Sequence, residues 1–226
     1  NLVEPLISVI TSIGYDHQQF LGNDLRQIAR EKAGIIKKGV NCITNNTDPM
    51  VLEELQTACQ SRSSRLKTLV PEENIEVLRI DLYGSQFNAI FSETSFHDLE
   101  ISLAGYHQII NAGLAVLAML NLGKIPVKET EIKSGLKKAR WPARLQIITE
   151  NPLVLLDVAH NIDGFEKVFN FIRLNLPARP IRVIAGLAKD KDYEKIARIL
   201  SENASTVGII RNFSERGMPA ENLKNE

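Results

Sequence analysis

The stretch Leu6-Ile7-Ser8-Val9-Ile10-Thr11-Ser12-Ile13-Gly14-Tyr15-Asp16-His17 decides how the first part of the chain folds. Its apolar, β-branched beginning predicts a buried parallel strand over residues 6–11, which ends before the glycine. Asn23 or Asp24 is placed to cap a helix that ends at Lys37-Lys38-Gly39, with cations at its negative end. The apolar run at residues 40–44 predicts the next strand. A strand, a helix and a further strand in this order are typical of an α/β fold.

The rest of the pattern divides the chain in two. Pro49 starts a predicted helix, residues 66–103 alternate like antiparallel strands, and helices are predicted over residues 107–122 and 127–138. Arg140-Trp141-Pro142-Ala143-Arg144 interrupts the pattern, so we expect domains at residues 1–139 and 140–226. In the second domain, strands over residues 153–157, 181–186 and 206–210 alternate with helices from about Ile162 and from Asp192. This βαβαβ order predicts a doubly wound parallel sheet, whose ligands bind at the carboxyl ends of the strands.

Composition narrows the class of protein. The chain has 226 residues, 44% of them hydrophobic, and 27 basic residues balance 27 acidic ones. A net charge of zero argues against a general binder of nucleic acids or anionic membranes, and no apolar run approaches the ~20 residues of a membrane span. Cys42 and Cys59 lack CxxC spacing and are expected to be buried, reduced thiols of a cytoplasmic protein. Because the chain starts with Asn1 and runs almost directly into a strand, we expect a fragment of a longer protein.

Two candidate metal-binding residues lie near the first strand. His17 follows Asp16, which is placed to orient its ring, so the pair indicates a metal ligand, a phosphate contact, or simply a capped loop histidine. Lys32 precedes Ala33 and Gly34, small residues that predict close packing, where a lysine needs a partner or a modification. Carbamylation would turn Lys32 into an anionic oxygen ligand of the kind that magnesium accepts.

The remaining candidates each have a structural alternative. Gln108 and Asn111 open a predicted helix, where they can read an adenine edge or cap the helix. Arg144 is placed to stabilise a transferring phosphoryl group or to form an interdomain salt bridge. Asp157 and His160 are placed to converge on one ligand at a strand-to-helix turn, where the alternative is a helix cap by Asn161 or Asp163.

Four ordered blocks of this sequence resemble the folylpolyglutamate synthase/dihydrofolate synthase family of the Mur ligase superfamily. They are Thr11 to Lys37, Gly105-Tyr106-His107-Gln108, Trp141-Pro142-Ala143-Arg144 and Asp157-Val158-Ala159-His160-Asn161. The family commonly has Gly at the positions of Ala143 and Val158. The resemblance implies an α/β fold in which the back part of a P-loop-type ATPase domain, the Mur ligase central domain, precedes a truncated, Rossmann-like glutamate-ligase domain.

The resemblance also implies a role for each matching residue. His17 is implied to bind magnesium and Lys32 to carry a carbamate near a second metal ion. Gln108 and Asn111 are implied to lie at the adenine of ATP. Arg144 is implied to contact the nucleotide phosphates, Asp157 to lie near the ribose or the hinge, and His160 to lie near the incoming glutamate.

The activity implied by the resemblance is ligation of L-glutamate to folate or dihydropteroate through an acyl phosphate, with ATP and Mg²⁺. A monomer with small-molecule substrates, without nucleic-acid or membrane partners, is expected. No GxxxxGK[ST] loop occurs in these residues, so we expect them to bind ATP poorly alone and to be inactive without that loop. Two alternatives stay open: a cell-wall amino-acid ligase of the same superfamily, and a non-catalytic binding protein.

Overall fold

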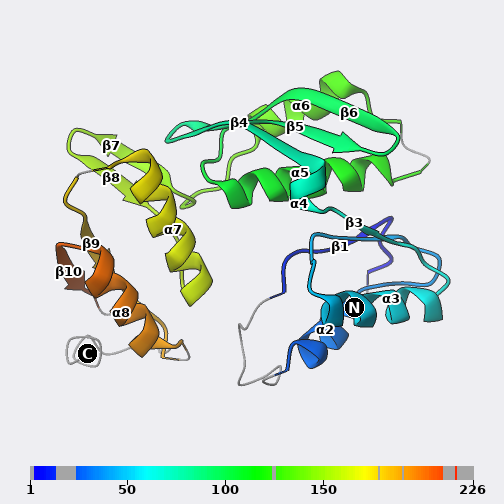
Figure 1. The fold of residues 1–226 in the computed structure, drawn as a ribbon, viewed down its shortest axis with the longest axis horizontal. Coiled ribbons are helices and arrows are strands. Elements are labelled where there is room, and N and C mark those ends of the chain that lie inside the picture. The colour runs from blue at the N-terminus through cyan, green and yellow to red at the C-terminus, as the bar shows by residue number, and fades with distance from the viewer. Residues whose placement is uncertain are drawn as a thin grey trace. The chain divides into compact units, whose positions relative to one another are not determined.

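The computed structural model describes residues 3–13, 24–123, 126–177, 179–189, 191–210 and Gly217. The chain forms two compact units, Asn1–Arg140 and Trp141–Glu226 (Figure 1). We describe each unit by itself. The mixture of helices and strands confirms the α/β class expected from the sequence. None of the helices in the described ranges is both long enough and apolar enough to span a bilayer.

The first unit begins with a parallel sheet of three short strands in the order β1 (Ser8–Ile10), β2 (Cys42–Thr44) and β3 (Leu66–Thr68). Two helices, α2 (Leu25–Ala33) and α3 (Pro49–Ser61), pack side by side against it (Figure 1). Asp24 caps α2 by accepting a hydrogen bond from the Arg26 amide, and Asp48 caps α3. The predicted strand and both helix starts are therefore confirmed.

Two expectations about this part were wrong. Helix α2 ends at Ala33, and Gly39, which has φ +72°, belongs to a later turn. The spacing of Ile36 suits a helix, but this residue instead reaches the core from the segment after the helix, where it is fully buried. Strand β3 was expected among the antiparallel strands, yet it extends the parallel sheet beside β2.

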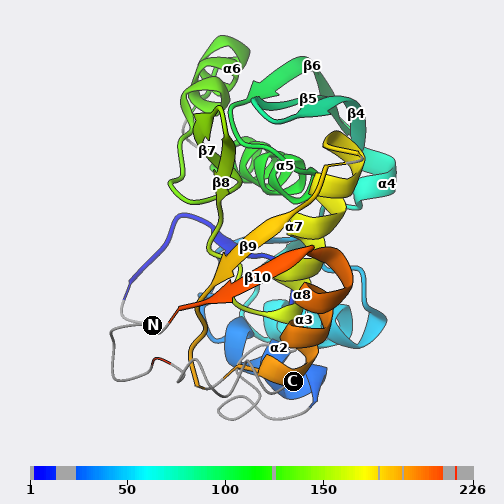
Figure 2. The ribbon, with the colours of Figure 1, turned by 90° about the vertical axis from the view of Figure 1, so that its left-hand side faces the viewer.

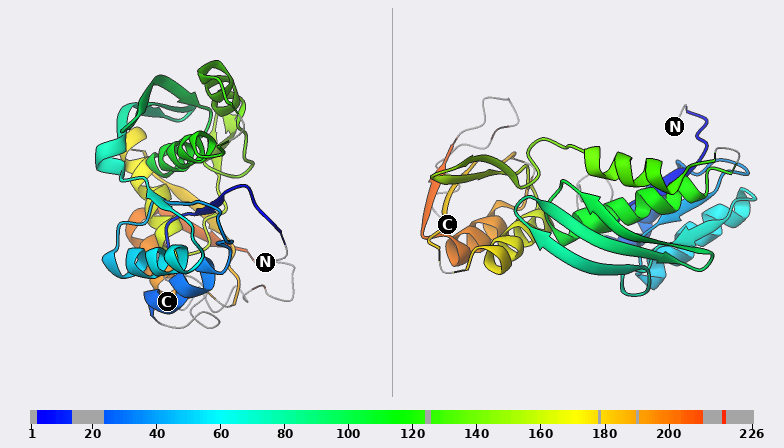
Figure 3. Two further views of the ribbon diagram at one scale, coloured as in Figure 1. Left: turned by 90° about the vertical axis from the view of Figure 1, so that its right-hand side faces the viewer. Right: turned by 90° about the horizontal axis from the view of Figure 1, so that it is seen from above.

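The second layer of this unit is an antiparallel sheet in the order β4 (Ile75–Asp81), β5 (Gly84–Phe91) and β6 (Thr94–Ile101), preceded by the short helix α4 (Pro71–Asn74). Helix α5 (Tyr106–Leu120) lies along one face of this sheet, and α6 (Glu129–Lys138) packs against β6 (Figure 3). The predicted antiparallel strands and both helices are confirmed.

Helix α5 is buried along two flanks. Ile109, Ala112 and Val116 pack into the core of the antiparallel sheet, which also holds Phe87 and Leu99. Ile110, Leu114 and Leu117 pack on the other side against Ile43 of the parallel sheet and Leu69, which directly follows β3. A helix that is apolar nearly all round is typical of a position between two layers.

The second unit contains the hairpin β7 (Gln146–Glu150) and β8 (Leu153–Leu156), the helices α7 (Ile162–Asn175) and α8 (Tyr193–Asn203), and the parallel strands β9 (Arg182–Ala185) and β10 (Thr206–Ile209) (Figure 2). Its core gathers Phe165, Phe169, Ile196 and Leu200. The β8-α7-β9-α8-β10 order was predicted correctly. Strand β7 was not predicted, and β8 pairs antiparallel with β7, whereas the parallel pairing joins β9 to β10.

Candidate functional site

The candidate site of the second unit is built on the turn that carries Arg144. The side chain of Arg144 is half-buried, and its two neighbours both adopt left-handed backbone, with φ +56° at Ala143 and φ +47° at Leu145. Non-glycine residues in this region are uncommon, because the Cβ atom crowds the backbone. Leu145 is only 3% exposed, so its side chain anchors the turn in the unit.

The Asp157 carboxylate fastens this turn to the end of β8. The Leu145 amide donates to Asp157 Oδ2 at 2.8 Å, and the Ala159 amide donates to Asp157 Oδ1 at 2.8 Å. The Val158 amide donates to the Ala143 carbonyl oxygen at 3.0 Å. The backbone on both sides of Arg144 is thus bonded to the dipeptide Asp157-Val158.

His160 belongs to the same network. Its Nδ1 lies 3.0 Å from the Val158 carbonyl oxygen, and only a protonated Nδ1 can donate to that oxygen. In the neutral ring this leaves Nε2 as the unprotonated nitrogen. Asn161 caps α7 by accepting from the Gly164 amide at 2.9 Å, as the structural alternative for this turn predicted. The structure therefore brings the backbone that flanks Arg144, the Asp157 carboxylate and the His160 ring into one hydrogen-bonded turn.

The two positions where the family commonly has Gly differ in their backbone. Ala143 lies in the left-handed region, where glycine is the favoured residue. Val158 is not among the residues with positive φ, and its side chain is 43% exposed. The conformation at Val158 therefore accepts a side chain, whereas the conformation at Ala143 is strained by one.

Gln108 and Asn111 form a second polar group, in the first unit at the beginning of α5. Gln108 is 8% exposed, and its Nε2 lies 3.2 Å from Nε2 of His107. Asn111 Nδ2 donates to Gln108 Oε1 at 3.3 Å. Neither residue caps the helix, because Gly105 with φ +103° occupies the cap position without a side-chain bond. The capping alternative for these two residues was wrong.

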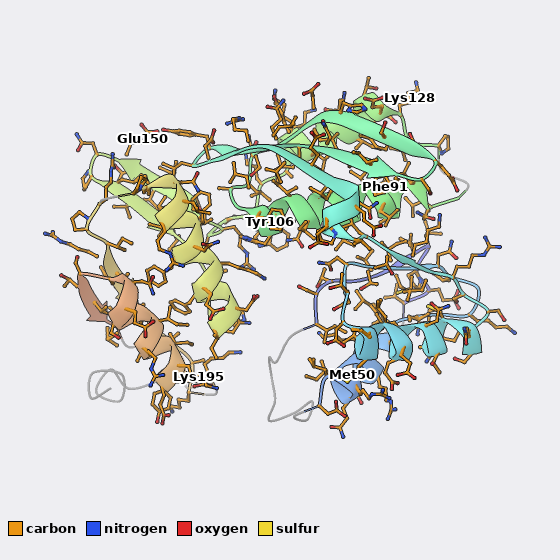
Figure 4. The ribbon with its side chains drawn as sticks, in the orientation of Figure 1. Met50, Phe91, Tyr106, Lys128, Glu150 and Lys195 are labelled. Carbon is orange, nitrogen blue, oxygen red and sulfur yellow. The ribbon has the colours of Figure 1, made fainter. Side chains whose placement is uncertain are left out.

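Tyr106 stands at the start of the same helix (Figure 4). Its side chain is partly desolvated and lies near the Glu72 carboxylate, and these two effects, the first being the larger, raise the pKa of the phenol above its ordinary value. At neutral pH the hydroxyl therefore remains protonated and able to donate a hydrogen bond.

Lys32 lies in the last turn of α2 with an exposed side chain. The expectation of close packing around it was wrong: Ala33 and Ile36 are buried, but Lys32 points outward from the helix. Arg30 on the same helix, in contrast, is paired: it donates two hydrogen bonds to the Glu54 carboxylate, and this lowers the pKa of that carboxyl. His17 and its neighbour Asp16 lie outside the described residues.

One relevant side chain was missed from the sequence. Asn46 is 5% exposed and joins the ends of β1 and β2: its Oδ1 accepts from the Ile13 amide at 2.7 Å, and its Nδ2 donates to the Thr11 carbonyl at 3.0 Å. It also bonds to the Thr44 hydroxyl. Asn46 therefore fixes the last described residues before the segment that contains His17. Within the described ranges, no three His, Cys, Asp or Glu side chains gather in a way that would hold a metal ion.

Comparison with known proteins finds a matching protein family for a large part of each unit. Residues 1–119 match the family described as the Mur ligase middle domain, and residues 143–226 match the family described as the Mur ligase, glutamate ligase domain. A dihydrofolate synthase/folylpolyglutamate synthase from Bacillus subtilis is 37% identical over 213 residues, which cover 92% of this chain and 49% of that protein. The chain spans about half the length of the curated relatives it matches.

Solved structures agree with the sequence matches. An FPGS–AMPPCP–folate complex aligns with a TM-score of 0.82 at 31% identity, covering 92% of this chain and 52% of that one. A Mycobacterium tuberculosis folylpolyglutamate synthase complexed with ADP aligns with a TM-score of 0.89 at 25% identity, covering 98% of this chain and 50% of that one.

Proposed function

Because the chain belongs to the Mur ligase family, we propose that it is part of an ATP-dependent ligase that adds L-glutamate to a folate. The residues described here would contribute the nucleotide-facing and glutamate-facing side chains of that enzyme. The observation that carries the proposal is the hydrogen-bonded turn at the end of β8, in which Asp157 and Val158 hold the backbone on both sides of Arg144 and the Val158 carbonyl oxygen holds the His160 ring. The folate substrate is supported by the names of the similar proteins.

The proposed reaction has two steps. The γ-phosphoryl group of ATP moves to a carboxylate oxygen of the folate, which gives ADP and an acyl phosphate. The glutamate amine then attacks the acyl carbon, and phosphate leaves as the amide forms. Arg144 would bind phosphate oxygens and stabilise the charge that develops during transfer. His160 would accept a proton from the attacking amine, since Nε2 is its unprotonated nitrogen in the neutral ring.

Gln108 and Asn111 are proposed to read the adenine of ATP. The Gln108 side-chain oxygen accepts a hydrogen bond from the Asn111 amide nitrogen, which fixes the orientation of both side chains. The two amides keep further N–H donors and oxygen lone pairs with which to bind the adenine edge. Gln108 is buried at the beginning of α5 with its carbonyl oxygen bonded to Asn111, so its side chain is held in one orientation, which supports a binding role.

Magnesium is proposed as the metal cofactor, and Lys32 could bind it only as a carbamate. As an ammonium, Lys32 offers no oxygen ligand, but its exposed Nζ is open to carbon dioxide, and a carbamate there would supply two oxygens. His17 would be the second ligand. When bound, the ion would neutralise phosphate charge. A monomeric state and a cytoplasmic location also remain proposals.

The test is phosphate release by the protein expressed from its complete coding sequence. We expect release that requires ATP, glutamate and either dihydropteroate or tetrahydrofolate, and that is lost in Lys32→Ala and Arg144→Ala. Lys133→Ala, on an exposed face of α6 where Lys133 pairs with Glu129, and Arg173→Ala, on α7, are the matched controls that should keep activity. Release with a cell-wall precursor in place of folate, or no release from a folded protein, would overturn the proposal.

A further inference from the structure

Three polar side chains form a hydrogen-bonded row in the first two turns of α5. Gln108 Nε2 lies 3.2 Å from Nε2 of the half-buried His107, and Gln108 Oε1 accepts from Asn111 Nδ2 at 3.3 Å. Gln108 stands in the middle, is only 8% exposed, and is bonded at both ends of its carboxamide. His107 is the member of this row to which the proposed function gives no role.

The chemistry of the three groups gives the row a direction. Gln108 Nε2 is an amide nitrogen and can only donate, so the facing Nε2 of His107 must be the unprotonated acceptor. In the neutral ring, the proton of His107 is then on Nδ1. Each hydrogen bond of the row points from Asn111 toward His107. The carboxamide of Asn111 therefore turns its nitrogen toward Gln108 and its oxygen away from it.

The row has one other self-consistent arrangement. If His107 Nε2 carried a proton, it would donate to Gln108 Oε1, Gln108 Nε2 would donate to Asn111 Oδ1, and both carboxamides would be turned around. A mixture of the two arrangements would set one N–H group against another beside the buried Gln108 and would lose a hydrogen bond there. The position of the proton on His107 therefore decides whether Asn111 turns an acceptor or a donor away from Gln108.

We propose that His107 is a positioning residue, which makes the proposed adenine site selective for a 6-amino purine. With the observed direction of the row, Asn111 presents Oδ1 and the second hydrogen of Nδ2, a pair of groups that binds the 6-amino group and a ring nitrogen of adenine. The reversed row would present a nitrogen donor, which suits the 6-oxo group of hypoxanthine or guanine. This inference rests on the proposed function, because it assigns the group that sets the base specificity of the nucleotide site.

Replacing His107 by a fixed acceptor or by a fixed donor tests the direction of the row. The protein expressed from its complete coding sequence is assayed with ATP and with inosine triphosphate (ITP), whose base carries a 6-oxo group. His107→Glu keeps an acceptor and should retain the wild-type preference for ATP. His107→Lys supplies only donors, so the ratio of kcat/KM for ATP to kcat/KM for ITP should fall about 10- to 100-fold, through KM more than through kcat.

The matched control is His97→Lys. His97 lies exposed on β6, where its ring nitrogen is 3.1 Å from the Ser95 hydroxyl, and this variant should leave the ATP-to-ITP ratio unchanged. A ratio that falls equally in His107→Glu and His107→Lys, or that falls in neither, would overturn the inference.

The ring nitrogens of His107 give a second test, which needs neither a substrate nor a folded variant of the site. In protein labelled with ¹⁵N-histidine at about pH 8, above the ordinary pKa of imidazole, two-bond ¹H–¹⁵N correlation distinguishes protonated from unprotonated ring nitrogens. The signals of His107 are those that disappear in His107→Glu. We expect a protonated Nδ1 and an unprotonated Nε2. A protonated Nε2 would overturn the inference, whereas inactivity of the unmodified protein would overturn only the proposed function.

Discussion

Replacing Ala143 and Val158 by Gly, one at a time, should change stability in opposite directions. Both substitutions introduce the residue that the family commonly has, but the two backbones differ. Ala143 has φ +56°, where an L-residue is disfavoured by about 1–2 kcal/mol relative to glycine. Glycine also stabilises the unfolded chain, by about 0.4–1 kcal/mol relative to alanine. With a small loss of buried methyl surface, Ala143→Gly should stabilise the protein by about 0.5 kcal/mol.

Val158→Gly gains nothing from the backbone, because Val158 does not have positive φ. It gives up the buried part of a side chain that is 43% exposed, about 1 kcal/mol, and adds the glycine entropy cost of similar size. We expect destabilisation by about 1.5–2 kcal/mol, so the two variants should differ in Tm by about 5–10 °C.

Scanning calorimetry on the two single variants and on Ala143→Val measures this difference. A β-branched residue tolerates left-handed backbone worst, so Ala143→Val should unfold at a lower temperature than the unmodified protein. The reasoning fails if Ala143→Gly is destabilising to the same extent as Val158→Gly, because glycine would then bring no benefit to the turn beside Arg144.

Three other predictions concern the first unit. Burial raises the pKa of Cys42 from 9.0 to about 12, so the thiolate at pH 8 is about 1,000-fold scarcer in the native protein, and Ellman's reagent should label Cys42 only after unfolding. The stability gained from this shift is present below pH 9 and is lost as the pH rises toward 12, so urea titrations should give a lower free energy of unfolding at pH 10 than at pH 8. Rapid labelling of the native protein would contradict the buried site. Gly84→Ala would place a Cβ 2.3 Å from the Ile101 carbonyl oxygen and should lower the free energy of unfolding by about 3 kcal/mol. Gly135→Ala on α6, where nothing lies within 4 Å of the added Cβ, should raise it by about 0.5–1 kcal/mol. Equal urea midpoints for the two variants would refute this contrast. Asn46→Ala should cost about 2 kcal/mol in urea unfolding, because the Ile13 amide and the Thr11 carbonyl lose their partner; an unchanged midpoint would show that water replaces the side chain.

Local signals made the helix starts predictable. Asp24 and Asn161 were among the expected caps, and each accepts a backbone hydrogen bond within its own first turn. The end of α2 was wrong because the helical spacing of Ile35 and Ile36 continues past Ala33, while the core draws Ile36 in from outside the helix. Strand β7 was missed because most of its side chains are exposed, so its identity depends on pairing with β8.

The candidate site was predictable where its residues are close in sequence. Asp157 and His160 are three residues apart, so a strand-to-helix turn necessarily brings them near each other. The bond between Asp157 and the Leu145 amide joins residues 12 positions apart and depends on two left-handed residues that no propensity favours. The outward direction of Lys32 could not be deduced from its neighbours either, because Ala33 and Ile36 are buried while Lys32 is exposed.

Helix α5 makes the two sheets of the first unit depend on each other. Its flanks belong to different cores, with Ile109 and Val116 in one and Leu114 and Leu117 in the other. If either sheet separated from α5, apolar side chains of the helix would be exposed to water. Because the same helix also covers the other core, that core would be affected as well. The first unit should therefore unfold as one cooperative body, and a cavity made by Leu114→Ala beside the parallel sheet should be felt in the antiparallel sheet as well.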